Sequence, residues 1–134
     1  MIPKYRVWDK ELQTMLDVYL IDFKKGVLVG EHWKFGETNF MSFDEIELMQ
    51  STGLFDKNNK EIFEGDVISD GYMSRNIRHH QALGFYTIDD NGVEEFFGDT
   101  ASLEDFEEVS KYMSENIEII GNVYENPELL EDKK

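Results

Sequence analysis

The stretch from Leu48 to Ile68, with the sequence LMQSTGLFDKNNKEIFEGDVI, constrains the fold of this chain more than any other part of it. Two runs in which apolar and polar residues alternate flank the polar segment DKNNK. Alternation with a period of two is typical of half-buried β-strands, and Asp and Asn favour turns because their short side chains bond the local backbone. The stretch therefore predicts a β-hairpin that runs from Met49 to Ile68.

Gly65 breaks the alternation of the second run, EIFEGDVI. A glycine inside a strand pattern indicates a β-bulge or a sharp bend, and such bends curl a small sheet toward a barrel. We therefore expect the returning strand to bend at Gly65. The carboxylates of Glu64 and Asp66 are expected to accept backbone or Arg hydrogen bonds at this bend.

Three segments of the chain resemble the YopX-like family of small phage and prophage proteins. The central stretch is similar to the family pattern LMQ-x-TGL-x-D-x-NGKEI, which continues with an aromatic residue and EGD. The segments YRVWD and IIGNVYENPELL are similar to the family's FRAWD near the N-terminus and VIGNIYENPELL near the C-terminus. The chain departs from the pattern at Asn59, where the family commonly has Gly. Asn is the next best residue for the positive φ of such a turn.

The resemblance implies a phage-encoded, mainly β protein built around a barrel. The family has no established biochemical function, so the resemblance implies neither an activity nor a cofactor. It leaves the segment from Gly71 to Glu115 unmatched.

Alternation and turn residues predict further strands in the rest of the chain. The segment from Ser69 to Asn76 has the composition of an exposed loop, and residues 36–39 form a polar break. Asp90, Asn91 and Gly92 predict a short hairpin turn, because Asn-Gly readily supplies the two positive φ values of a type I′ turn. The expected strands are Tyr5–Val7, Leu16–Phe23, Val27–Val29, Leu83–Ile88, Val93–Phe97 and Ile117–Tyr124.

Apolar residues at helical spacing predict one amphipathic helix from Leu103 to Met113, with acidic residues on its other face. Its expected core-facing residues are Leu103, Phe106, Val109, Tyr112 and Met113. The fold class that follows is mainly β (α+β), with antiparallel hairpins curled into a small barrel and this helix packed on it.

The length of 134 residues predicts a single domain over residues 1–130, followed by a frayed C-terminal tail at residues 131–134. The chain contains no cysteine, which excludes disulfides and thiolate metal sites. No apolar run approaches the roughly 20 residues of a membrane helix. We therefore expect an intracellular protein without membrane partners, and the resemblance to phage proteins implies the cytoplasm of a bacterial host.

The acidic charge of the chain bears on its partners. There are 13 basic and 29 acidic residues, a formal net charge of −16. Between Asp89 and Glu108 there are nine carboxylates and no Lys or Arg. Phosphate backbones repel such a surface, which disfavours direct nucleic-acid binding. The leading hypothesis is a non-enzymatic phage accessory protein that binds another protein, basic or nucleic-acid-binding, through an acidic surface that includes Glu104, Glu107 and Glu108.

Two alternatives belong to other functional classes. A barrel could bind nucleic acid through a minority basic face formed by Arg6, Lys24, Lys25, Arg75 and Arg78.

A metal-dependent enzyme could instead use His79 or His80 with Glu64 or Asp66. Neighbouring residues of a strand face opposite sides, so His79 and His80 cannot bind one ion together, and His32 is the only other histidine. We recognise no catalytic motif and predict no catalytic, cofactor or metal residues. Exposed strand edges would also allow a homo-oligomer, which the net charge opposes.

Overall fold

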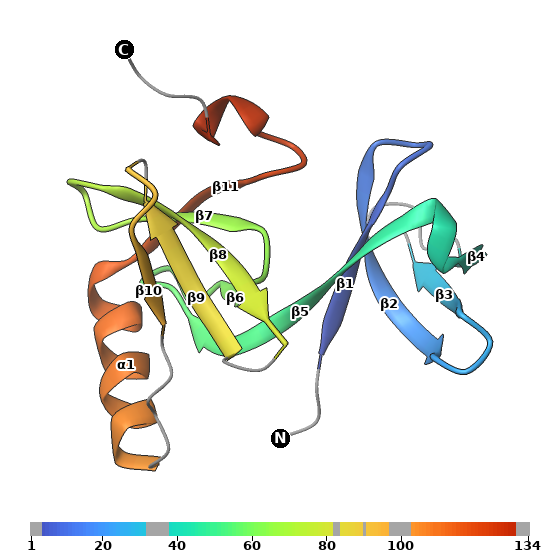
Figure 1. Cartoon of the computed structure of the whole chain (residues 1–134). Helices are drawn as coiled ribbons and strands as arrows, with labels where there is room; N and C mark the ends of the chain where they lie inside the picture. The colour runs from blue at the N-terminus through green and yellow to red at the C-terminus, as the bar shows by residue number, and fades with distance from the viewer. Residues whose placement is uncertain (1–3, 32–37, 82–83, 90, 97–102, 131–134) are drawn as a thin grey trace. The chain divides into compact units, whose positions relative to one another are not determined.

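The computed structural model describes residues 4–31, 38–81, 84–89, 91–96 and 103–130 (Figure 1). The chain divides into two compact units, residues 1–51 and residues 52–134, which we call unit 1 and unit 2. The described residues form two antiparallel sheets and one α-helix, which confirms the prediction of a mainly β protein. The single domain over residues 1–130 stays a prediction, and the tail at 131–134 lies outside the described residues.

Unit 1 is an antiparallel sheet in which the strands follow the order β4-β3-β2-β1-β5. Alternating side chains from all five strands build its core. The strands are β1 (Tyr5–Asp9), β2 (Thr14–Asp22), β3 (Val27–Glu31), β4 (Thr38–Ser42) and β5 (Ile46–Phe55), with a 3-10 turn, η1 (Phe43–Glu45), before β5. The buried core residues are Val7, Leu16, Leu28, Met41 and Ile46.

Strand β4 begins inside the predicted polar break, so that part of the prediction is wrong. The register pairs Leu28 with Met41 and Val29 with Phe40. Met41 is buried while Phe40 is exposed. The sequence signal is an alternation of only a few residues, too short to separate an edge strand from a loop.

The predicted central hairpin is confirmed as far as Phe63, whereas residues 66–68 belong to a strand of the other sheet. Strand β5 pairs with β1 up to Gln50 and continues into unit 2, where a turn leads to β6 (Glu61–Phe63). The Thr52 hydroxyl donates to the carbonyl of Ile62 at 2.7 Å across this hairpin. Asn59 has a φ of 62°, the left-handed conformation for which the family pattern commonly uses Gly.

The predicted bend at Gly65 is also confirmed. Gly65 has a φ of 91°, and it lies in a turn between β6 and β7 (Asp66–Ser69). These two strands belong to different sheets, so the bend is where the chain leaves one sheet for the other. The described strands form open sheets with two ends each, and closure into a barrel stays unconfirmed.

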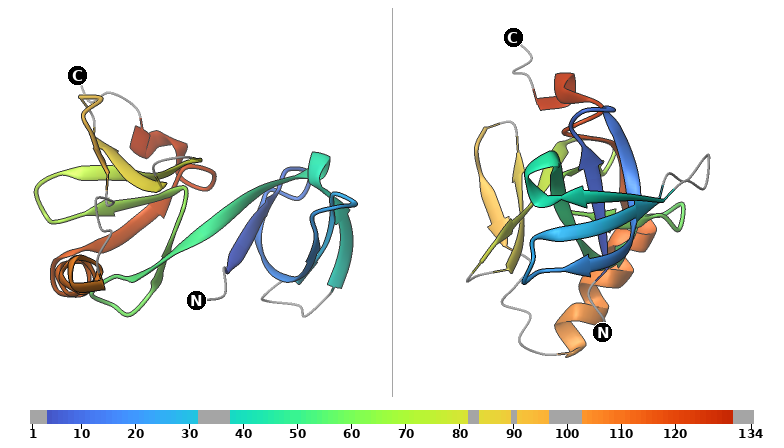
Figure 2. Two further views of the ribbon diagram at one scale, coloured as in Figure 1. Left: turned by 60° about the horizontal axis from the view of Figure 1, so that its bottom comes forward. Right: turned by 90° about the vertical axis from the view of Figure 1, so that its right-hand side faces the viewer.

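The sheet of unit 2 has the order β10-β9-β8-β7-β11, and α1 lies along one of its faces (Figures 1 and 2). Its further elements are β8 (Ser74–His80), β9 (Gly84–Asp89), β10 (Glu94–Phe96), α1 (Leu103–Asn116), β11 (Glu118–Asn122) and the 3-10 helix η2 (Pro127–Leu130). Met113 and Ile117 at the end of α1 pack against Ile68 and Ile77 of the sheet. No helix within the described ranges is long and apolar enough to span a membrane.

The predicted helix is confirmed, and it extends three residues further than expected. Met113 is buried and Val109 packs against the core, as predicted. Tyr112 was predicted to be a core residue but is 50% exposed, so that prediction is wrong. The side chains of Leu103 and Phe106 lie outside the described residues.

Two predictions for the sheet of unit 2 are wrong in part. The expected loop from Ser69 to Asn76 is shorter, because β8 begins at Ser74 and Asn76 is buried. The turn between β9 and β10 is at the expected place, but the amide of Asp89 donates to the carbonyl of Val93, so the loop is longer than the two residues of a type I′ turn. The Asp89 carboxylate also accepts the N–H of Val93, which draws this residue into the turn.

Several Asp side chains and one Asn side chain are structural, because they organise turns. In each case Oδ1 accepts the backbone N–H two residues later and a second N–H three or four residues later. This arrangement occurs at Asp9, Asp22, Asp56, Asp70, Asp89 and Asn122.

Asp56 differs from the other turn residues because it also makes a long-range contact. Its Oδ1 accepts the amides of Asn58 at 2.9 Å and Lys60 at 2.8 Å. Its Oδ2 accepts the amide of Ile119 at 3.0 Å, although Ile119 is 63 residues away in the sequence. Asp56 is only 2% exposed. One carboxylate therefore holds the central turn and strand β11 together.

Candidate functional site

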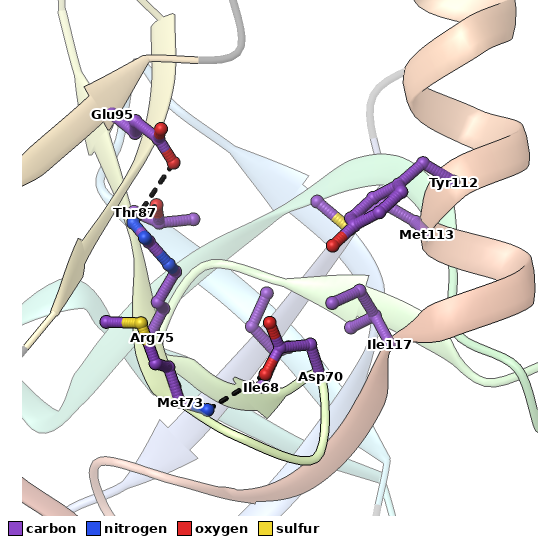
Figure 3. Close-up of a pocket in the computed structure, with 9 residues that line it drawn as sticks. All are labelled: Ile68, Asp70, Met73, Arg75, Thr87, Glu95, Tyr112, Met113 and Ile117. Carbon is purple, nitrogen blue, oxygen red and sulfur yellow. Dashed lines mark hydrogen bonds and ion pairs between the residues drawn. The ribbon is translucent and has the colours of Figure 1, made fainter.

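A cavity of about 150 Å³ lies between α1 and the sheet of unit 2, and we call it the α1 pocket (Figure 3). Its residues come from strands β7 to β10, the β7–β8 loop and the end of the helix. They are Ile68, Asp70, Met73, Arg75, Thr87, Glu95, Tyr112, Met113 and Ile117. The pocket brings together parts of the chain that the sequence analysis treated separately.

One side of the α1 pocket is apolar. Ile68, Met113 and Ile117 belong to the core and form its inner wall. Met73 and Tyr112 stand at its rim and are 43% and 50% exposed. Figure 3 shows the Tyr112 side chain projecting from α1 over the pocket. The wall therefore offers partly exposed apolar surface without opening the core itself.

The other side of the α1 pocket is polar. Arg75 Nη1 lies 3.1 Å from Glu95 Oε2, and it donates a hydrogen bond to the Thr87 hydroxyl at 3.4 Å. The Glu95 side chain is 71% exposed, so this ion pair contributes little to stability. The amides of Met73 and Tyr72 bind the Asp70 carboxylate and hold its pKa below the usual 3.8. Asp70 is therefore a carboxylate at neutral pH.

The predicted partner-binding glutamates lie on α1. Glu107 and Glu108 are both exposed, while the side chain of Glu104 lies outside the described residues. Glu108 precedes Tyr112 by four residues, so these two side chains share one edge of the helix. Glu107 is on another edge. Helical spacing thus relates Glu108, and not Glu107, to the edge of α1 that carries Tyr112.

A model of one protein family accounts for nearly all of the chain. The model, described as YopX protein, matches residues 4–131. The chain belongs to the YopX protein family. The resemblance found in three short segments is therefore confirmed over almost the full length.

One solved structure similar to this YopX protein is that of protein EF1440 from Enterococcus faecalis. The two sequences are 26% identical, and the structures superpose with a TM-score of 0.61. The similarity covers 98% of this chain and 99% of EF1440. No curated protein sequence matches this YopX protein.

In the central stretch, the residues that match the YopX pattern stabilise the fold. Asp56 holds the turn to β11, and Thr52 bonds Ile62 across the hairpin. Asp66 Oδ2 accepts the amide of Phe63 at 2.8 Å at the bend, as expected for a structural carboxylate. The α1 pocket, by contrast, lies mainly in the segment that the resemblance left unmatched.

The described residues do not assemble the metal site that was considered as an alternative. His79 and His80 are exposed neighbours on β8, and the His79 ring packs on Phe85 with a centroid distance of 4.7 Å. Asp66 is buried, with its Oδ2 bonded to the backbone. Across the residues described, no group of three or more His, Cys, Asp or Glu side chains could hold a metal ion. His32 lies outside them.

The predicted basic face is divided within unit 2. Arg75 points into the α1 pocket, where Glu95 pairs with its charge. Arg78 is three residues further along β8, and therefore faces the opposite side of the sheet, where its Nε donates to Asn76 Oδ1 at 3.0 Å. Arg6, Lys24 and Lys25 belong to unit 1. The two arginines of unit 2 thus have different side-chain partners, although both contribute to the lining of a second cavity.

Proposed function

We propose that this YopX protein is a non-enzymatic protein-binding module in which unit 2 binds a basic segment of a partner protein. The observation that carries the proposal is the α1 pocket, where exposed apolar surface lies beside carboxylates. Unit 2 contains 20 acidic and 7 basic residues, a net charge of −13. A phage accessory role in the cytoplasm of the bacterial host belongs to the same proposal.

The apolar wall would supply most of the binding free energy. A cavity of about 150 Å³ is large enough for a benzene-sized group. One aromatic or large aliphatic side chain of the partner fits this volume, and burying it contributes about 1.5–3 kcal/mol. Tyr112 and Met73 at the rim would contact the same side chain.

The carboxylates would select the sign of the partner's charge. Asp70 and Glu95 line the pocket, and Glu108 lies one helical turn from Tyr112. Lys or Arg residues next to the apolar anchor would pair with them, while an acidic segment would be repelled. The negative field of unit 2 would also raise the association rate of a basic partner.

A labelled peptide with one Phe between pairs of Lys residues tests the proposal by fluorescence anisotropy at low salt. We expect saturable binding that weakens as salt is raised, because salt screens exposed charges. Replacing the Phe of the peptide by Ala should weaken binding at least about tenfold, because the anchor is lost.

Glu108→Lys and Glu107→Lys are a matched pair of variants, because both side chains are exposed on α1. Only Glu108 shares an edge of the helix with Tyr112. We expect Glu108→Lys to weaken peptide binding about fivefold and Glu107→Lys to change it less than about twofold. Equal effects of the two variants, or no saturable binding of the peptide, would contradict the proposal.

A further inference from the structure

A row of apolar side chains crosses the outer face of unit 1. The strand register places Leu20 of β2 opposite Val29 of β3, and Val29 opposite Phe40 of β4. Leu20 and Phe40 are 54% and 83% exposed, whereas Leu28 and Met41 in the neighbouring row are buried. Large apolar side chains gathered on a solvent-facing surface are typical of an interaction site.

The row ends at β4, which is the last strand of its sheet. The sequence of β4, TNFMS, contains no charged residue and no proline. Its register on β3 is continuous from Thr38 to Ser42, without a bulge. Charges, prolines and bulges are the features that usually prevent an edge strand from pairing with another chain. Strand β4 has none of these three features.

The backbone of β4 presents hydrogen-bonding groups at this edge. The amide of Phe43 donates to the carbonyl of Gly26 at 2.8 Å, at the next position of the register after the pair of Ser42 and Val27. In an antiparallel ladder, alternate residues direct both N–H and C=O toward the same neighbour. The N–H and C=O groups of Phe40 and Ser42 therefore point away from β3.

We propose that two copies of this chain pair through β4, as antiparallel strands related by a twofold axis beside Phe40. Phe40 is the central residue of β4, so this register sets Phe40 opposite Phe40 of the second copy, and Thr38 opposite Ser42. The outward backbone groups then meet their counterparts. The two apolar rows join into one row across both sheets. Twofold dimers are the commonest closed assemblies of identical chains.

The distribution of charge favours unit 1 as the surface of self-association. Unit 1 contains 6 basic and 9 acidic residues, a net charge of −3, against −13 for unit 2. Copies of so acidic a chain repel one another most through unit 2 and least through the uncharged β4. An extended segment of another protein could add to the same edge. The uncharged β4 favours a second copy instead, because it is the edge at which two copies of this acidic chain repel each other least.

Sedimentation velocity over a concentration series, at low and high salt, tests the dimer. We expect a species of twice the 15.7 kDa chain mass, which becomes more populated as concentration and salt rise. Hydrogen exchange over the same series should show concentration-dependent protection of the Phe40 and Ser42 amides. A chain that is monomeric throughout the series overturns the proposal. So does a dimer in which the β4 amides gain no protection.

Phe40→Glu is the direct variant, because a side chain that is 83% exposed does not support the core. It should weaken the dimer at least about tenfold by placing two like charges at the centre of the interface. Tyr72→Glu is the matched control, because Tyr72 is 95% exposed but lies in unit 2. It should leave dimerisation unchanged.

Leu20→Glu tests the same row if the Phe40 variant fails to fold. A dimer that persists in a folded Phe40→Glu variant overturns the proposal. Binding of the basic peptide to unit 2 should not change in the Phe40→Glu and Leu20→Glu variants, whose substitutions lie in unit 1. The dimer and the function proposed for unit 2 can therefore fail independently.

Discussion

Unit 1 and unit 2 distribute their apolar and charged residues differently. The core of unit 1 is built by strands and the η1 turn, and a row of apolar side chains on the outer face of its sheet remains exposed. Unit 2 closes its core with α1 and carries more than two thirds of the carboxylates. Similar antiparallel pairing thus supports an apolar, nearly neutral edge in one unit and an acidic pocket in the other. The type of sheet does not determine what its surface can bind.

Two aspartates at turns, one in each unit, also differ in how far along the chain their hydrogen-bond partners lie. Asp22 in unit 1 accepts two amides of its own exposed turn, those of Lys24 and Lys25. Asp56 in unit 2 accepts two local amides and the distant amide of Ile119. The same residue type at the same kind of turn thus makes only local hydrogen bonds at Asp22 and an additional tertiary one at Asp56.

The largest effects are expected from truncating the two cores, which share no residue. Leu28 in unit 1 and Ile77 in unit 2 are both fully buried. We expect Leu28→Ala and Ile77→Ala each to lower the free energy of unfolding by about 2–5 kcal/mol, measured by urea titration. Hydrogen exchange should rise most in β2–β4 for Leu28→Ala and in β7–β9 for Ile77→Ala. An equal rise across both units would mean that they unfold together.

A smaller but more selective effect is expected from Asp56→Ala. This change removes three hydrogen bonds to backbone amides from a buried position, so we expect a loss of about 3 kcal/mol in the free energy of unfolding. Asp22→Ala is the matched variant in unit 1. It should cost about 1 kcal/mol, because water can bind the amides of its exposed turn. Similar losses for the two would remove the distinction between local and tertiary turns.

The smallest effect is the pH dependence of Asp56. Burial raises the pKa of the Asp56 carboxyl. Hydrogen bonds from the amides of Ile119, Lys60 and Asn58, together with the positive charge of Lys60, lower the pKa by more, so it lies below 3.8. A carboxyl with a lower pKa in the folded state stabilises the protein at pH values above its unfolded pKa. That stabilisation is lost as the pH falls through the folded pKa.

Asp56→Asn preserves the shape of the side chain and removes its ionisation. The stability difference between the native chain and this variant should therefore be constant near neutral pH and shrink below about pH 4. Urea unfolding over this range provides the measurement. A difference that does not change with pH would show that the ionisation of Asp56 does not contribute to stability.

Much of the fold could be predicted from local sequence. The central hairpin, the bend at Gly65 and the helix follow from period-two alternation, one glycine and helical spacing. The loop expected through Asn76 was wrong because the polar residues of β8 are satisfied by tertiary contacts. Asn76 Nδ2 donates to the carbonyl of Asp66, and its Oδ1 accepts from Arg78. Composition alone predicts a loop for such a strand.

The candidate site was less predictable. Arg75, Thr87 and Glu95 meet only because three strands align in one register, which no short stretch of sequence specifies. Tyr112 has the helical spacing of a core residue, but it lies at the rim of a pocket. Helical spacing predicts the side of the helix on which a residue lies, but not whether another element covers that side. Of the three predicted glutamates, helical geometry relates Glu108 to this rim.

The bond between Asp56 and Ile119 also sets an order of events during translation. The carboxylates of Asp9 and Asp22 in unit 1 bind amides only two and three residues further along the chain, so these bonds can form soon after the turns leave the ribosome. Asp56 must wait for a further 63 residues, or roughly 3–13 s at about 5–20 residues per second. During that interval its carboxylate is hydrated and unattached to β11. The nascent chain therefore completes its N-terminal unit first and secures the second only when its C-terminal strand arrives.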